Sequence, residues 1–492
     1  MSDVKVDKKS MDKKRKNRIL LYIGLVVFII LLLLPSPQGL PTNGKNVLVI
    51  LLFQMYLLVT QVLPFGVVGL IPVIFLPLLG ILGPKVDPDL LISSVQGYSS
   101  DVIFLVIAGF FIGGAMQKWG LHKRVSYTIA SVVGNKPSTI LLGFMIATAI
   151  ISMFLTNTAT VVMMMPIAVA FIRATGLEKG NLFAAALVTS ISYSANIGGV
   201  GTPTGSSLSA GAIGLIPELT GHEFTYSMYL GVGIPFVIVS IFCAWLILKL
   251  IYKPDKAPGT ENIQKDTIME ARNSLGKITK NEIYVMVIIL LLIIGLLTRP
   301  STWGKHLPLV SDGIYATLIS FLLFLIPVDN KEYLYTWDDA KEDVDFGLLL
   351  MVGGFLTIAR LLGPTGVTDY LASIISNIEG VSGWGGVYIL GGITNLLSNF
   401  GVNMFAALPL SHAVATGLDL SIPLTLFVVT CVAQLNISLP ERATNALSIG
   451  TGYATVGQLL KGGILISISN IIIAPLVIRF ITMGILGIGA MW

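Results

Sequence analysis

The chain has 492 residues, of which 54% are hydrophobic and only 12% are charged, with a formal net charge of +5. Soluble domains carry about twice that charged fraction, so this composition excludes a soluble globular protein and indicates a polytopic membrane protein. The small positive charge gives no reason to expect a nucleic-acid partner. Two cysteines, Cys243 and Cys431, both lie in apolar runs, which excludes a disulfide framework and a cysteine metal site.

Residues 1–17 form a basic tail that precedes the first apolar run. The basic residues of the tail are Lys5, Lys8, Lys9, Lys13, Lys14, Arg15 and Lys16. Because segments rich in Lys and Arg stay in the cytoplasm, we expect a cytoplasmic N-terminus and a first span within 18–44. We expect no cleaved signal peptide, because the apolar run is too long and no small-residue cleavage site follows. These features place the chain in the cell membrane as a multi-pass protein.

Residues 45–252 predict a first repeat of membrane spans with two interruptions. The apolar segment 136–174 is interrupted at Thr156–Thr158, which predicts a re-entrant hairpin that enters and leaves the membrane on one side. The next span, 182–215, is broken by the run Gly198–Ser207. Glycine and proline at the density of this run cannot continue a helix.

The polar linker 253–280 divides the chain, and residues 281–492 repeat the same plan. The second repeat contains a predicted re-entrant hairpin at 383–417 and a broken span at 422–450. With the first span, the two repeats predict about 11 transmembrane helices plus two re-entrant hairpins. An odd number of crossings in each repeat inverts the second relative to the first. Inverted repeats with broken helices are typical of secondary transporters, so the predicted fold is an all-α, polytopic transporter.

The interruptions of the first repeat carry polar groups that suit ion and anion binding. Hydroxyl and amide side chains at Thr156–Thr158 would be costly if they faced lipid. At a hairpin tip that faces water, their oxygens can coordinate a hard cation, and their donors can bind a carboxylate. The run Gly198–Ser207 frees backbone amides and helix N-termini that can face an anion. The alternative is that these are packing glycines and hydroxyls bonded to their own helices.

The second repeat has comparable features. Ser398-Asn399 precedes Pro409 in the second hairpin, and Pro440–Asn445 interrupts the next span. Two amides set across one site suit a substrate with two carboxylates. His412 lies beside this region, and we interpret it as a structural histidine with satisfied hydrogen bonds. We interpret Arg360, near the end of an apolar run, as reaching the membrane surface.

These motifs resemble those of the divalent anion/sodium symporter family, which includes sodium-coupled di- and tricarboxylate carriers and related exchangers. The resemblance rests on Thr156–Pro166, Ser192–Ser207 and Ser398-Asn399, and it covers residues 45–490. It implies a C4 or C5 dicarboxylate substrate such as succinate, malate or 2-oxoglutarate. It also implies an elevator mechanism and a homodimer in the lipid bilayer.

The resemblance also assigns roles in substrate and sodium binding to individual residues of this chain. The substrate-binding positions of the family fall on Asn157, Thr158, Ser206 and Asn399. We extend the candidate substrate site to Ser207, Ser398, Arg442 and Thr444. The first sodium site of the family falls on Ser152, Thr156, Asn157 and Gly205. Sodium as the coupling ion is therefore the only cofactor that we consider.

The second repeat departs from the pattern of the family. Phe400 stands where the family has a threonine, and Glu441-Arg442 stands where the family has small neutral residues. A guanidinium stays charged in proteins, so Arg442 should repel a second sodium and could neutralise a substrate carboxylate. A carrier with a fixed countercharge need not wait for sodium. Our main prediction is therefore dicarboxylate exchange (antiport), with sodium-coupled symport as the alternative. Arg442 could also pair with Glu441 and face water.

Two other classes of protein fit the sequence less well. An anion channel could also use two converging breaks, but the sequence has no ring of charged residues and no carbonyl-filter signature. An enzyme is not expected, because the sequence has no nucleophile elbow, metal-binding histidine pair or phosphate loop. Among carrier substrates, sulfate and citrate stay open beside the dicarboxylates.

Overall fold

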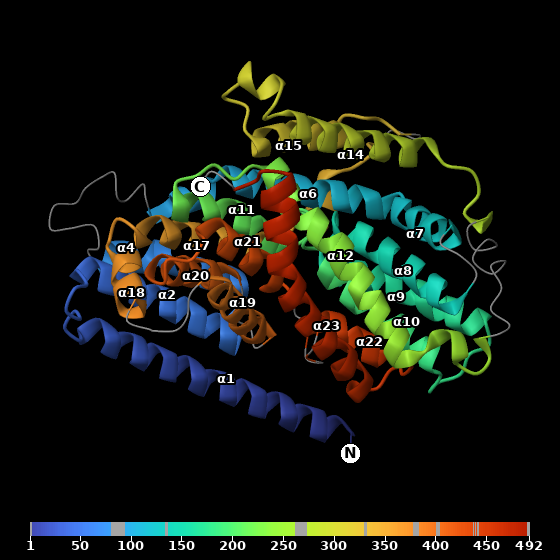
Figure 1. Cartoon of the computed structure of the whole chain (residues 1–492), viewed down its shortest axis with the longest axis horizontal. Coiled ribbons are helices and arrows are strands. Elements are labelled where there is room, and N and C mark those ends of the chain that lie inside the picture. Colours follow the sequence, from blue (N-terminus) through green and yellow to red (C-terminus); the bar gives the residue numbers. More distant parts are fainter. Residues whose placement is uncertain are drawn as a thin grey trace.

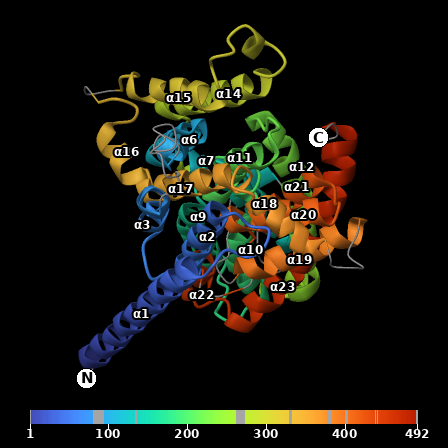
Figure 2. The same ribbon diagram turned by 90° about the vertical axis from the view of Figure 1, so that its left-hand side faces the viewer.

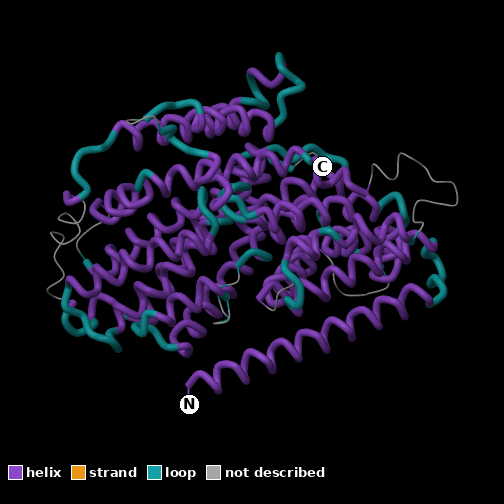
Figure 3. Tube along the Cα trace, turned by 180° about the vertical axis from the view of Figure 1, so that it is seen from behind, coloured by secondary structure: helices purple, strands orange, loops and turns teal. Residues whose placement is uncertain are grey.

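The computed structural model describes residues 2–79, 94–132, 136–260, 273–328, 332–376, 383–399, 404–435, 437, 439 and 442–489. These residues form helices and connecting loops (Figure 3). Their only β pairing is an isolated bridge between Pro327 and Tyr333.

The first half of the chain forms helices α1 to α12. Their bounds are α1 Ser2–Leu33, α2 Thr42–Thr60, α3 Phe65–Gly69, α4 Ile71–Leu78, α6 Asp101–Lys118, α7 Leu121–Val132, α8 Pro137–Ser152, α9 Asn157–Ala174, α10 Leu182–Gly198, α11 Ser207–Thr220 and α12 Tyr226–Tyr252. Helix α1 already begins at Ser2, so the basic tail continues the first helix. Lys and Arg favour helix, and no proline precedes Pro35.

The second half forms helices α14 to α23. Their bounds are α14 Lys280–Thr298, α15 Asp312–Phe321, α16 Trp337–Asp343, α17 Phe346–Leu362, α18 Val367–Ile375, α19 Gly383–Asn399, α20 Met404–Gly417, α21 Ile422–Val432, α22 Ala443–Gly450 and α23 Val456–Val477. Helix α23 continues into a π-helix over Ile478–Ile485.

The described residues contain 7 helices long and apolar enough to cross a membrane, or up to 8 if the bent pair α16–α17 counts as one span. The chain is therefore an all-helical, polytopic membrane protein. This count is lower than the predicted number of crossings, because several apolar segments are divided into shorter helices of 10–17 residues, such as α8, α10, α11, α20 and α21. The inverted repeats, the re-entrance of the two hairpins and the elevator mechanism stay predictions.

The helices form a body with two distinct edges. Helices α14 and α15 lie side by side along one edge, where α15 packs on α6 (Figures 1 and 2). Helix α1 lies along the opposite edge in Figure 1 and packs against α2. The Lys45 ammonium of α2 donates to the carbonyl oxygens of Leu32 and Leu34 at 2.7 and 2.8 Å, which satisfies the free carbonyls at the end of α1.

Helix α10 lies at the centre of the packing around the first interruption. Its residues from Phe183 to Gly198 are all buried, and it packs against α8, α9 and α12. Small residues such as Ala184, Ala185 and Ala186 allow neighbouring helices to approach closely. This position brings the end of α10, at Gly198, next to the turn that joins α8 and α9.

Arg360 forms an ion pair between two helices. The Arg360 side chain on α17 is 24% exposed, and its Nε donates to Glu218 Oε1 of α11 at 2.7 Å. Its Nη1 is buried and has no partner within the described part of the chain. The interpretation that Arg360 reaches the membrane surface stays a prediction, and the structure adds that a carboxylate on a neighbouring helix pairs with its guanidinium.

Replacing Arg360 with methionine should lower the stability of the protein. Removing one partner of a buried ion pair costs about 3–5 kcal/mol, and the partial exposure here reduces the expected loss to roughly 1–2 kcal/mol. A lower melting temperature in detergent measures this loss. Because both single replacements remove the same ion pair, the double replacement of Arg360 with methionine and Glu218 with glutamine should cost less than the sum of the two single replacements. Simple additivity would contradict the pairing.

Candidate functional site

The first interruption is a turn between α8 and α9. Helix α8 ends at Ser152, and α9 begins at Asn157 after Thr156, whose hydroxyl caps the new helix by accepting from the Ala159 amide at 3.3 Å. A threonine cap satisfies an amide that a helix start leaves unpaired. The turn therefore presents Asn157 and Thr158 in the first turn of α9. The Thr158 side chain is exposed.

Oxygen atoms converge where this turn meets the broken span. The Ser152 hydroxyl lies 2.7 Å from the Ala195 carbonyl oxygen and 3.0 Å from Asn157 Oδ1, and it can donate to one of them at a time. A Cβ atom on Gly199 would lie 2.1 Å from Asn157 Oδ1 and 3.1 Å from the Gly205 carbonyl oxygen. A Cβ atom on Gly205 would lie 2.6 Å from the Ser152 carbonyl oxygen. The cluster is built from neutral oxygens, which suit a hard cation such as sodium.

Replacing Gly199 with alanine should abolish transport while the protein still folds. The added methyl would meet Asn157 Oδ1 at 2.1 Å, so the amide must leave the oxygen cluster. Uptake of radiolabelled dicarboxylate should fall to background, and the sodium concentration for half-maximal uptake should rise in any residual activity. Gly457→Ala is a matched control, because nothing lies within 4 Å of its added methyl. Equal uptake by the two variants would contradict a role for this cluster.

A chain of hydrogen bonds joins the first half to the second. Asn157 Nδ2 lies 3.4 Å from Asn196 Oδ1, and Asn196 Nδ2 donates to the hydroxyl of Thr444 at 3.2 Å. The Ser192 hydroxyl, one turn before Asn196, donates to the Thr444 carbonyl oxygen at 2.6 Å. Thr444 thus lies beside the first interruption although about half the chain separates them in sequence.

The second part of the broken span begins at Ser206. The Ser206 side chain is 8% exposed and caps α11 by accepting from the Leu208 amide at 3.2 Å. One turn on, the Ser209 hydroxyl donates to the Gly199 carbonyl oxygen or to Gln434 Oε1, each at 2.8 Å. The side chain of Ser207 lies outside the described part of the structure.

The second hairpin is held by Arg442. The guanidinium Nη2 donates to the carbonyl oxygens of Ser398 and Asn399 at 2.7 and 3.3 Å, at the end of α19. The Ser398 hydroxyl and the Asn399 amide both donate to the Asn395 carbonyl oxygen, one turn earlier. Arg442 is half-buried, so its guanidinium lies against the hairpin instead of facing open water. Phe400 and Glu441 lie outside the described residues.

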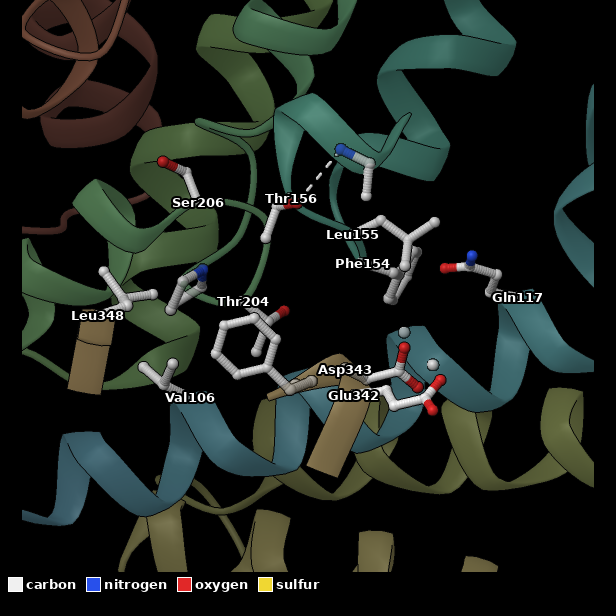
Figure 4. A pocket seen from close by; sticks show the side chains of 16 residues that line it. Val106, Gln117, Phe154, Leu155, Thr156, Thr204, Ser206, Glu342, Asp343 and Leu348 are labelled. Carbon is white, nitrogen blue, oxygen red and sulfur yellow. Dashed lines mark hydrogen bonds between the residues drawn. The ribbon is translucent and has the colours of Figure 1, made fainter. Parts of the chain in front are cut away.

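A cavity of about 220 Å³ opens beside the first interruption. Figure 4 shows Thr156, Thr204 and Ser206 on one side, and the carboxyl groups of Glu342 and Asp343 on the other. Asp343 accepts from the Tyr335 hydroxyl at 2.5 Å. Two carboxylates in one wall attract a cation and repel a dicarboxylate. The cavity therefore suits the approach of a cation to the turn between α8 and α9.

The structure thus gathers part of the predicted site. Asn157, Ser152, Thr156, Gly205 and Thr444 lie around one network, whereas Ser398, Asn399 and Arg442 form a second group at the tip of α19. Sequence reasoning missed Asn196 and Gln434 as members of the network. Both are buried amide side chains in apolar surroundings: Asn196 lies near the end of α10, and Gln434 lies just after the end of α21.

Comparison with known proteins identifies the family of this chain. The family described as "Sodium:sulfate symporter transmembrane region" matches residues 15–486. The sodium-dependent dicarboxylate transporter SdcS of Staphylococcus saprophyticus is 33% identical over 493 residues, covering 95% of this chain and 92% of that protein. SdcS of Staphylococcus aureus is 33% identical over 513 residues, covering 97% and 95% of the two chains. The chain therefore belongs to the divalent anion/sodium symporter family, and it is a membrane transporter and not an enzyme.

Proposed function

We propose that this protein carries C4 and C5 dicarboxylates, such as succinate, malate and 2-oxoglutarate, across the cell membrane by sodium-coupled symport. The observation that carries the proposal is the hydrogen-bonded network of Asn157, Asn196 and Thr444, which joins both halves of the chain next to an oxygen cluster. Amide and hydroxyl side chains in the interior of a membrane protein are costly unless they pair with one another or bind a ligand. The similar proteins named as sodium-dependent dicarboxylate transporters support the same substrate class.

Sodium coupling rests on the first-half cluster. Asn157 Oδ1, the Ser152 hydroxyl and the carbonyl oxygens near Gly199 and Gly205 offer neutral ligands to one sodium ion. The bound ion would place a positive charge beside the Asn157 amide and favour a carboxylate there. The names of the relatives favour this symport alternative over the exchange that the sequence predicted.

Exchange is the second candidate, and Arg442 is the observation that favours it. Its guanidinium binds the last carbonyl oxygens of α19, where a free cation could otherwise bind. We propose that Arg442 serves as a fixed cation for the second hairpin, so that this half needs no second sodium. With one sodium ion bound in the first half and Arg442 as a fixed cation in the second, the protein would still be a sodium-coupled symporter. Without the sodium ion, it would be an exchanger.

The remaining parts of the proposal concern movement and assembly. We propose that the two hairpins and the broken spans move together as an elevator, that the protein is a homodimer in the bilayer, and that its N-terminus is cytoplasmic. The exposed apolar side chains of α1, including Tyr22 at 64% and Leu33 at 80%, suit contact with lipid.

Saturable uptake of radiolabelled succinate into proteoliposomes tests the substrate proposal. We expect malate and 2-oxoglutarate to compete and internal succinate to stimulate uptake, as in a carrier. Sulfate and citrate, which the sequence leaves open as substrates, are added to the same assay to see whether they also compete with succinate. Uptake that rises linearly with concentration, without stimulation by internal substrate, would support a channel instead.

A further inference from the structure

The hydroxyl of Ser209 lies between the broken spans of the two halves. Ser209 belongs to the first turn of α11 and is fully buried. Its oxygen lies 2.8 Å from the carbonyl oxygen of Gly199, at the break of the first half, and 2.8 Å from Oε1 of Gln434, in the second half. Because a hydroxyl has one proton, Ser209 can donate to only one of these two oxygens at a time.

The orientation of the Gln434 amide makes the two oxygens competitors for this proton. Nε2 of Gln434 donates to the Thr430 carbonyl oxygen at 2.8 Å and lies 3.4 Å from the Tyr229 hydroxyl. A carbonyl oxygen only accepts hydrogen bonds, so the nitrogen of the amide faces Thr430 and its oxygen faces Ser209. Gln434 and Gly199 are both buried. The oxygen that Ser209 does not bond therefore loses a hydrogen bond that bulk water does not replace.

Gly199, the first of these partners, belongs to the oxygen cluster. Helix α10 ends at Gly198, so the helix itself supplies no partner to the carbonyl oxygen of Gly199. A Cβ atom on Gly199 would lie 2.1 Å from Asn157 Oδ1, and a Cβ atom on Gly205 would lie 3.1 Å from the Gly199 carbonyl oxygen. A hydrogen bond from Ser209 therefore fixes the backbone that lies against Asn157. Groups that orient the ligands of an ion in this way strengthen its binding.

Gln434, the second partner, belongs to the interruption of the second half. It follows the end of α21 at Val432, and its Nε2 lies 4.0 Å from the sulfur of Met404, the first residue of α20. Helix α11 packs closely on α20, since a Cβ atom on Gly211 would lie 2.4 Å from the ring of Phe405. Figure 1 shows α11 beside α20 and α21. A movement of the second hairpin or of the second broken span would therefore move Gln434 relative to α11.

We propose that Ser209 is a positioning residue for the coupling ion, whose hydroxyl turns between Gly199 and Gln434. The proposal rests on the proposed function, because it concerns the sodium ion of the first-half cluster. While Ser209 bonds Gly199, the cluster is held in place and binds sodium tightly. When Ser209 turns to Gln434, the backbone at Gly199 is released and the affinity for sodium falls. Sodium favours the first arrangement, so its binding changes the state of the second half in return.

The melting temperature of the full-length protein in detergent, titrated with sodium chloride against potassium chloride, tests the proposal. Ser209→Ala removes the donor and should raise the half-saturating sodium concentration about fivefold or more. Gln434→Met removes the competing oxygen at similar size. Because the two distances from Ser209 are equal, this variant should bind sodium about twofold more tightly, although its melting temperature in potassium falls. The double variant should have the half-saturating sodium concentration of Ser209→Ala, because no proton is left to share.

Ser320→Ala is the matched control. The Ser320 hydroxyl is equally buried but donates to the Thr317 carbonyl oxygen of its own helix at 3.0 Å, so its loss should leave the half-saturating sodium concentration unchanged.

The outcomes separate this proposal from the proposed function. If sodium stabilises the natural protein no more than potassium does, sodium coupling fails, and the role of Ser209 fails with it. If sodium does stabilise it, an unchanged half-saturating concentration in Ser209→Ala overturns the role of Ser209 alone. An unchanged or higher value in Gln434→Met does the same, and this variant keeps the proposal testable if Ser209→Ala does not fold. Additive effects in the double variant would contradict a shared proton.

Discussion

Replacing Asn157 with alanine is expected to lower dicarboxylate uptake by about 100-fold, the loss of roughly 3 kcal/mol. The Asn157 amide holds the Ser152 hydroxyl at 3.0 Å and faces Asn196 at 3.4 Å, so alanine removes one ligand of the oxygen cluster and one end of the network between the two halves. Hydrogen bonds to charged groups are worth about 1.5–3 kcal/mol each. Initial rates of succinate uptake into proteoliposomes, at equal protein content, measure the effect.

Asn181→Ala is the matched control for this experiment. Asn181 caps α10 by accepting from the Phe183 and Ala184 amides at 2.9 and 3.2 Å, far from the turn between α8 and α9 in sequence. Its loss should cost about 1 kcal/mol of stability through the missing cap, with uptake retained. If both asparagine variants lost uptake to the same extent, general destabilisation would explain the result and the assignment of Asn157 to the site would fail.

Replacing Arg442 with alanine should lower uptake about 10- to 100-fold at low sodium, because a hydrogen-bonded charge at the hairpin is worth roughly 1.5–3 kcal/mol. The variant leaves the Ser398 and Asn399 carbonyl oxygens without their donor. A free cation can then bind these oxygens, so high sodium should restore part of the activity. The measurement is the sodium dependence of uptake, which should become steeper in Arg442→Ala than in the natural protein.

One further variant tests the charge of Arg442, and a second serves as a control. Arg442→Gln keeps hydrogen-bond donors without the charge and should resemble alanine in its sodium dependence. Arg173→Ala removes an exposed arginine from the last turn of α9 and should leave uptake unchanged. An unchanged rate and sodium dependence in Arg442→Ala would contradict the proposal that its guanidinium replaces a cation.

The local sequence was sufficient for predicting the interruptions. Thr156–Thr158 and Gly198–Ser207 stand out because hydroxyls, amides, glycine and proline disrupt apolar runs, and helices do end at Ser152 and at Gly198. These features depend on residues close together in the chain. The cation ligands Ser152 and Gly205, in contrast, follow only from the resemblance to the family and stay predictions.

Contacts between distant residues could not be predicted in this way. Arg442 reaches the carbonyl oxygen of Ser398, 44 residues earlier, and nothing in its local sequence distinguishes this contact from pairing with Glu441. Arg360 finds Glu218 across 142 residues. His412 lies in an apolar helix that is typical of a packed core, and only its surroundings show that Nδ1 has no hydrogen-bond partner among the described residues, so the expectation that its hydrogen bonds are satisfied is wrong. In each case the deciding partner lies on another helix.

Uptake of succinate into empty proteoliposomes, with and without an inward sodium gradient, tests the central claim most directly. Sodium-coupled symport predicts that succinate accumulates above its external concentration in empty vesicles with sodium outside, and that replacing sodium with potassium abolishes this accumulation. Vesicles preloaded with succinate serve as the exchange control. Uptake that requires internal dicarboxylate and is indifferent to sodium would contradict symport and establish exchange.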